Sequence, residues 1–250
     1  MTHKDAANRI IIALDVEDKI KALKLVDGLK DARIFKIGLR LFSAEGPPFL
    51  REMTARGKQV FLDLKFHDIP NTVAQAVRVC VGYGIHMMTL HASGGSEMIS
   101  KAAEAAGEEA ARVGIPKPIL LAVTVLTSMK ADNLEEIGLA PDPESQVVRL
   151  ARLSKKAGAG GIVCSPKEIK VVKEAVGSQM DFPVVTPGIR PAWAAANDQK
   201  RIMTPSEALG IGADYLVIGR PVIAAPSPQE AFRKILDEIS DRKISGPSEN

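Results

Sequence analysis

Eight short apolar runs, separated by amphipathic stretches, restrict the fold of this chain more than any other feature. The runs occupy residues 9–15, 33–39, 58–66, 86–93, 118–126, 160–165, 182–189 and 214–220. Residues 71–84, 95–114 and 143–158 have helical periodicity and end in glycine, a common helix terminator. Apolar strands joined by helices indicate a parallel sheet covered on both faces. Eight such units in 250 residues predict a single (β/α)8 TIM barrel spanning residues 1–250.

An open, doubly wound sheet is the alternative to the barrel. That fold typically has a glycine-rich turn directly after its first strand, but residues 13–19 (ALDVEDK) contain no glycine. No P-loop and no GxGxxG motif occurs, and the glycine-rich residues 158–161 precede their predicted strand instead of following it. The barrel is therefore favoured, with flexible ends expected at residues 1–8 and 244–250.

The composition argues against nucleic-acid binding, a membrane location and secretion. The formal net charge is +3 and aromatic residues make up 4% of the chain, so neither a basic surface nor a base-stacking surface is indicated. No apolar run approaches the roughly 18 residues of a membrane span, and residues 1–9 lack the apolar segment of a signal peptide. Cys80 and Cys164 have no CxxC spacing, so we expect buried, unpaired cysteines in a reducing, cytoplasmic environment.

Five charged residues are expected at one rim of the barrel. Asp15 ends the first strand, Lys36 lies on the second, Asp63 and Lys65 end the third, and Asp68 follows in the loop. Asp63 and Lys65 share a face because they are two apart on a strand, and active sites of this fold lie at the carboxyl ends of the strands. A structural ion-pair network is the alternative. The cost of desolvating charges favours a catalytic array.

A lysine between carboxylates is expected to stay protonated, because neighbouring negative charge raises its pKa. Such a lysine is a proton donor and not a Schiff-base nucleophile. This reasoning argues against an aldolase mechanism, which needs a neutral amine.

The ends of the last two predicted strands have the features of a phosphate site. Gly188 and Arg190 follow the seventh strand, and Gly219 and Arg220 follow the eighth. In TIM barrels the loops after these strands commonly bind phosphate through backbone N–H groups and arginine. Ordinary turns with solvated arginines are the alternative for either motif alone. Residues 190–205 suit either a mobile flap over the phosphate or an ordinary surface excursion.

The histidines do not have metal-site spacing. His67 and His91 lie near predicted strand ends, but no HExxH or paired-histidine pattern occurs. We therefore expect no metal site and a structural, hydrogen-bonded role for His91. Trp193 is expected to pack within its loop.

Several segments resemble those of the orotidine 5'-phosphate decarboxylase family. Residues 63–72 (DLKFHDIPNT) are similar to the family's central D-x-K-x-x-D motif. The segments ALDV, FKIG, LAVTVLTSM, TPGIRP, DQKRIMTP and DYLVIGRP occur in the family's order along nearly the whole chain. The resemblance implies a homodimer of barrels that converts orotidine 5'-monophosphate to UMP without a metal or an organic cofactor.

The resemblance also implies a role for each charged residue. Asp63 would lie against the departing carboxylate, and Lys65 would protonate C6. Asp15 and Lys36 would contact the ribose hydroxyls, and Lys36 would also belong to the catalytic array. Asp68 would reach the site from the partner subunit and complete the alternating array.

Further positions are implied to bind the rest of the substrate. Thr72 would lie beside the ribose of the partner's site, and Thr127 would contact the pyrimidine edge. The phosphate would be held by Arg190, Gln199, Gly219 and Arg220.

Two other functions stay open. Relatives similar to 3-keto-gulonate-6-phosphate decarboxylase and hexulose-phosphate synthase use Mg²⁺, but lack the TPGIRP and DQKRIMTP context present here. A non-catalytic protein that binds a phosphate ligand would have no need of Lys65 in a costly charged array.

Overall fold

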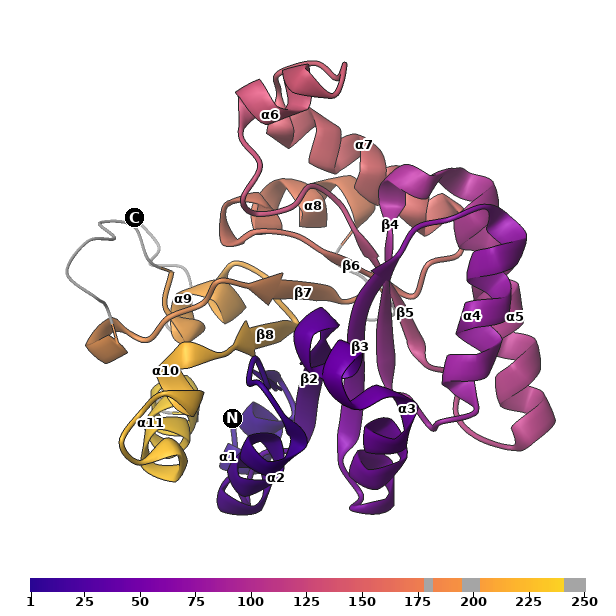
Figure 1. Cartoon of the computed structure of the whole chain (residues 1–250). Helices are drawn as coiled ribbons and strands as arrows, with labels where there is room; N and C mark the ends of the chain where they lie inside the picture. Colours follow the sequence, from indigo (N-terminus) through magenta and orange to yellow (C-terminus); the bar gives the residue numbers. More distant parts are fainter. Residues whose placement is uncertain (178–181, 195–202, 241–250) are drawn as a thin grey trace, which may run out of the picture.

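Eight parallel strands form a closed barrel in the computed structural model, which describes residues 1–177, 182–194 and 203–240 (Figure 1). The strands are β1 (Ile10–Ala13), β2 (Ile34–Gly38), β3 (Gln59–Phe66), β4 (Met87–His91), β5 (Ile119–Val123), β6 (Gly161–Val163), β7 (Val184–Pro187) and β8 (Tyr215–Ile218). Each strand pairs with the next along the chain, and β8 returns to pair with β1. The prediction of a (β/α)8 barrel is confirmed. The alternative prediction, an open doubly wound sheet, is wrong, because the described strands form a closed barrel.

Helices lie around the outside of these strands (Figure 1). They are α1 (His3–Ala7), α2 (Lys19–Gly28), α3 (Leu39–Ala55), α4 (Pro70–Val81), α5 (Gly95–Val113), α6 (Ala131–Glu136), α7 (Pro143–Lys156), α8 (Ile169–Val176), α9 (Pro205–Gly210), α10 (Arg220–Ile223) and α11 (Pro228–Ser240). Short 3-10 turns add η1 (Ala92–Gly94), η2 (Pro166–Glu168) and η3 (Ala192–Ala194). No helix in the described part of the chain is long and apolar enough to cross a membrane.

The amino-terminal segment, expected to be a flexible end, includes the short helix α1. Thr2 caps this helix by accepting a hydrogen bond from the backbone N–H of Asp5, a stabilising arrangement at a helix start. Ala6 and Ala7 are buried, and His3 lies 3.0 Å from Asp237 of α11. The other expected flexible end, residues 244–250, lies outside the described residues.

Two apolar cores arise from the alternation of side chains along the strands. Residues of one parity, including Ile11, Phe61 and Leu121, fill the inside of the barrel. Residues of the other parity, including Phe35 and Leu62, pack between the strands and the helices. The alternate residues that face inward along each strand continue to its carboxyl end. The charged residues at the rim therefore follow directly on the apolar residues that fill the barrel.

Both cysteines are unpaired and buried, as expected. Burial raises the pKa of the Cys80 thiol to about 12 and also raises the pKa of Cys164. Because the thiolate is the reactive form of cysteine, both residues act as small apolar side chains in the folded chain.

Candidate active site

A cavity of about 340 Å³ opens at the carboxyl ends of the strands. Apolar side chains such as Phe61, Val123 and Val217 form part of its wall. The predicted site residues that line it are Asp15, Lys36, Asp63, Lys65, Thr127, Gly188, Arg190, Gly219 and Arg220. The structure therefore brings together the charged end of β3 and the glycine–arginine motifs after β7 and β8. These segments are more than a hundred residues apart in the sequence.

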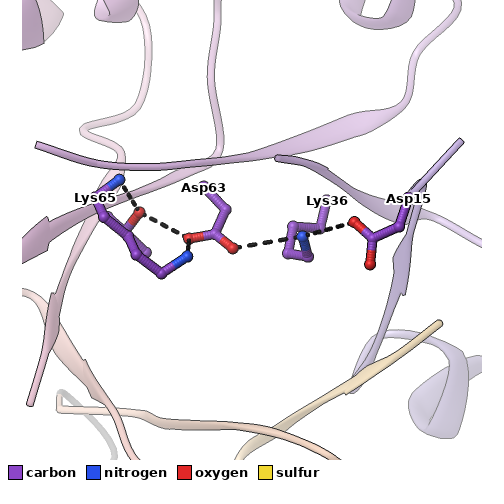
Figure 2. A network of polar contacts seen from close by, with 5 residues as sticks. Asp15, Lys36, Asp63 and Lys65 are labelled. Carbon is purple, nitrogen blue, oxygen red and sulfur yellow. Dashed lines mark hydrogen bonds and ion pairs between the residues drawn. The ribbon is translucent and has the colours of Figure 1, made fainter. Parts of the chain in front are cut away.

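Four charged side chains form an alternating row across one side of this cavity, as Figure 2 shows. The Lys65 ammonium lies 2.8 Å from Oδ1 of Asp63, and the Lys36 ammonium lies 3.4 Å from Oδ2 of the same carboxylate. Lys36 also lies 3.2 Å from Oδ1 of Asp15. The side chains of Lys36 and Asp63 are each only 12% exposed, whereas that of Asp15 is 60% exposed. The two middle charges of the row, Lys36 and Asp63, are thus buried, and its two ends, Asp15 and Lys65 (29% exposed), are more accessible.

Asp63 stays ionised despite its burial. Burial by itself opposes the charged form, but the positive charges of Lys36 and Lys65, together with hydrogen bonds, outweigh it and hold the pKa of Asp63 below its ordinary value. Hydrogen bonds from Lys65 and Thr89 act in the same direction. The site therefore holds a buried, ionised carboxylate between two ammonium groups.

The backbone at Lys65 leaves the regular strand conformation. The pairing of β3 with β4 shifts between Leu62, opposite Met88, and Phe66, opposite Leu90, so that residues 63–65 face a single residue of β4. Lys65 has a φ of +52°, the one positive φ of a non-glycine residue in the described part of the chain. Such left-handed conformations cost about 1–3 kcal/mol and persist only where the surroundings enforce them. Lys65 therefore occupies a strained position at the site.

Thr89 of β4 is a member of this network that the sequence reasoning did not identify. Its side chain is buried, and its hydroxyl lies 2.9 Å from the Lys65 backbone nitrogen and 3.0 Å from Oδ1 of Asp63. The available signal was a polar residue between the apolar Met88 and Leu90, on the same parity as Met87 and His91.

The ends of β7 and β8 carry the expected features of an anion site. Gly188 has a φ of +80°, a conformation that glycine adopts without strain. A Cβ on Gly219 would lie 3.5 Å from Ala13 and 3.8 Å from Asp15, which is ordinary van der Waals contact, so Gly219 lies beside the Asp15 end of the charged row. Arg190 and Arg220 both line the cavity, and the backbone N–H of Arg190 donates to the carbonyl of Met203.

Some predicted residues do not meet in this cavity. Asp68 and Thr72 are exposed, do not line it, and lie at the start of the loop and helix that follow β3. The Asp68 carboxylate accepts a hydrogen bond from the backbone N–H of Ile69 at 2.6 Å. Gln199 lies outside the described residues, as do residues 195–202 of the segment for which a flap was considered.

The histidines pack together beside the charged row. The rings of His67 and His91 are 5.4 Å apart and tilted by 40°. Burial lowers the pKa of His91, and the charges of His67 and Lys65 add to this effect. Within the residues described, no group of three or more His, Cys, Asp or Glu side chains has the geometry to hold a metal ion. Trp193 is half-exposed and lies 5.7 Å from the Lys234 ammonium of α11.

Known proteins match this chain over almost its full length. The profile of the family described as "Orotidine 5'-phosphate decarboxylase / HUMPS family" matches residues 8–235. A relative from Moorella thermoacetica named orotidine 5'-phosphate decarboxylase is 50% identical over 241 residues, 96% of this chain and 95% of the relative. A relative of the same name from Nostoc sp. is 45% identical over 93% of this chain and 98% of its own length.

A solved structure agrees with the sequence comparisons. The crystal structure of orotidine 5'-phosphate decarboxylase from Lactobacillus acidophilus superposes with a TM-score of 0.80 at 37% identity. The match covers 92% of this chain and 98% of the solved one.

Proposed function

The chain belongs to the orotidine 5'-phosphate decarboxylase / HUMPS family, and we propose that it is an enzyme of pyrimidine biosynthesis that converts orotidine 5'-phosphate to UMP and CO2. The observation that carries the proposal is the row of Asp15, Lys36, Asp63 and Lys65, which shares one cavity with two arginines. The row provides charges for the reacting carboxylate and carbon, and the arginines provide a site for the phosphate.

The chemistry requires one bond to break and one to form. The bond between C6 of the pyrimidine and the carboxylate carbon breaks, and its electron pair stays on C6 as CO2 leaves. We assign to Lys65 the stabilisation of this charge and the transfer of a proton from its ammonium to C6, after which the amine regains a proton from water. The 2.8 Å contact with Asp63 supports this assignment, because it holds the ammonium at the cavity wall.

Asp63 is assigned a role in raising the energy of the bound substrate relative to the transition state. An ionised carboxylate beside the substrate carboxylate repels it, and the repulsion falls as neutral CO2 forms. Interactions that improve only on the way to the transition state lower the barrier, whereas uniform binding does not. The support for this role is that Asp63 is buried and has a lowered pKa.

The remaining site residues are assigned to binding. Asp15 and Lys36 would contact the ribose hydroxyls, and Thr127 would contact the pyrimidine edge. The phosphate would be bound by Arg190, Gln199, Gly219 and Arg220. Binding energy from the phosphate, which does not react, can order the charged row around C6.

We also propose that the enzyme is a homodimer in the cytoplasm, with Asp68 and Thr72 entering the partner's cavity. Both residues are exposed and lie outside the cavity of their own chain. Ile69, beside Asp68, is 67% exposed, and Leu39, at the start of α3, is 59% exposed. Burial of these apolar side chains against a partner would favour association. The two buried thiols fit a reducing compartment.

The Mg²⁺-dependent relatives and a non-catalytic phosphate-binding protein are the alternatives. The family description includes a second group of enzymes, but the similar relatives named above carry the decarboxylase name. The direct test is to add orotidine 5'-phosphate to EDTA-treated protein and to follow the loss of its ultraviolet absorbance, with UMP identified as the product. We expect turnover in EDTA. Activity that appears only with Mg²⁺, or binding without turnover, would support the first or the second alternative.

A further inference from the structure

The hydroxyl of Thr89 closes a ring of hydrogen bonds around the reacting end of β3. The Lys65 backbone N–H lies 2.9 Å from this hydroxyl, the hydroxyl lies 3.0 Å from Oδ1 of Asp63, and the same oxygen lies 2.8 Å from the Lys65 ammonium. Thr89 is thus bonded both to the main chain of Lys65 and to the carboxylate that its side chain contacts.

The direction of each hydrogen bond in this ring is determined. A backbone N–H only donates, so the Thr89 oxygen accepts from Lys65. An ionised carboxylate only accepts, so the Thr89 hydroxyl hydrogen must point at Asp63. The hydroxyl has one donor and uses it here, in a side chain that is 1% exposed. Its orientation is therefore locked, and the ring has a single arrangement.

The backbone of Lys65 explains why such a support is needed. Glycine adopts a φ of +52° without strain, but glycine has no ammonium, so a lysine here must be held in the strained conformation by its neighbours. The shifted pairing of β3 with β4 takes residues 63–65 out of the regular ladder. The Thr89 side chain provides the hydrogen-bond acceptor for the Lys65 backbone in this stretch.

We propose that Thr89 is a positioning residue of the decarboxylase, which holds Lys65 in its left-handed conformation and directs Asp63 against the Lys65 ammonium. The inference rests on the proposed function, because it concerns the orientation of the Lys65 ammonium, the proposed proton donor. Thr89 does not line the substrate cavity. It acts on the reaction through Lys65 and Asp63, and not through the residues at the ends of β7 and β8 that are assigned to the phosphate.

Two pairs of proteins test this role by deleting the hydroxyl at nearly constant volume. Wild type is compared with Thr89→Val, and Thr89→Ser is compared with Thr89→Ala, so one pair remains informative if a variant folds poorly. We expect the loss of the hydroxyl to lower kcat about 10- to 100-fold in each pair, the scale of a hydrogen bond to a charged group. The affinity for UMP, measured by calorimetry, should change less than about threefold, because its phosphate contacts are elsewhere.

Thr186→Val is the matched control. Thr186 of β7 is also fully buried, does not line the cavity, and its hydroxyl has no hydrogen-bond partner within the described residues. The same substitution there should leave kcat unchanged. Two results would show that Thr89 is not a positioning residue. In the first, the kcat of Thr89→Val stays within about threefold of wild type, and that of Thr89→Ala within about threefold of Thr89→Ser. In the second, kcat and the affinity for UMP fall together. An inactive wild-type protein would instead overturn the proposed function itself.

Discussion

Mixing two inactive variants tests whether each active site is shared between subunits. Lys65 lines the cavity of its own chain, whereas Asp68 is exposed outside it. If Asp68 serves the partner's cavity, Lys65→Ala and Asp68→Ala damage different sites of a mixed dimer. One site then carries both lesions and the other carries neither, because a two-fold axis makes the exchange reciprocal.

The expected recovery follows from counting intact sites. Random exchange in an equal mixture makes about half of the dimers mixed, and each mixed dimer has one intact site of two, so about a quarter of the wild-type activity should return. Each variant alone should be nearly inactive. Activity is measured by the loss of orotidine 5'-phosphate absorbance before and after exchange, and native mass spectrometry of differently tagged chains measures the fraction of mixed dimers.

A second mixture gives the matched control. Lys36 and Lys65 line the same cavity of one chain, so Lys36→Ala mixed with Lys65→Ala leaves a lesion in every site and should recover nothing. The shared-site reasoning is refuted if the mixed dimers form and the Asp68→Ala mixture also stays inactive. Asp68 would then serve the cavity of its own chain.

Two further predictions concern binding and pH. Arg220→Ala should weaken the transition-state binding of orotidine 5'-phosphate by about 1.5–3 kcal/mol, the scale of a hydrogen bond to a charged group, because Arg220 is exposed in the free chain. The effect on orotidine should be small, so kcat/KM is compared for both substrates. Equal losses would mean that the phosphate site is misplaced. Because the pKa of Asp63 in the folded chain lies below its ordinary value of 3.8, the stability that its charge contributes should be present above pH 3.8 and be lost as the pH falls through the lower, folded-state pKa. The difference in unfolding free energy between wild type and Asp63→Asn should therefore shrink in acid denaturation experiments below about pH 4, and a constant difference would contradict this assignment.

The regular part of the barrel explains why much of the site was predictable. Ile34 and Lys36, like Phe61 and Asp63, are two apart on one strand, and the register confirms that they belong to columns that face inward. Strand order then places the ends of β1, β2, β3, β7 and β8 around one opening. Periodicity along single strands was enough for these residues, since it depends only on local sequence.

The irregular part was not predictable from periodicity. The shift between β3 and β4, the left-handed Lys65 and the bridging Thr89 depend on how two strands pair, which a pattern within one strand does not contain. Asp68 shows a different limit, because the site that we propose for this exposed carboxylate belongs to another chain. The family resemblance gave it a role that neither composition nor spacing provided.

The turnover of Lys65→Ala in EDTA tests the central claim most directly. The variant and the wild type are incubated with orotidine 5'-phosphate, UMP formation is followed by chromatography, and UMP binding confirms that the variant keeps its site. Loss of both the charge at C6 and the proton donor should lower kcat by roughly three orders of magnitude or more, while wild-type turnover is unaffected by EDTA. Turnover of the variant within about tenfold of wild type would contradict the assignment of Lys65 as the proton donor.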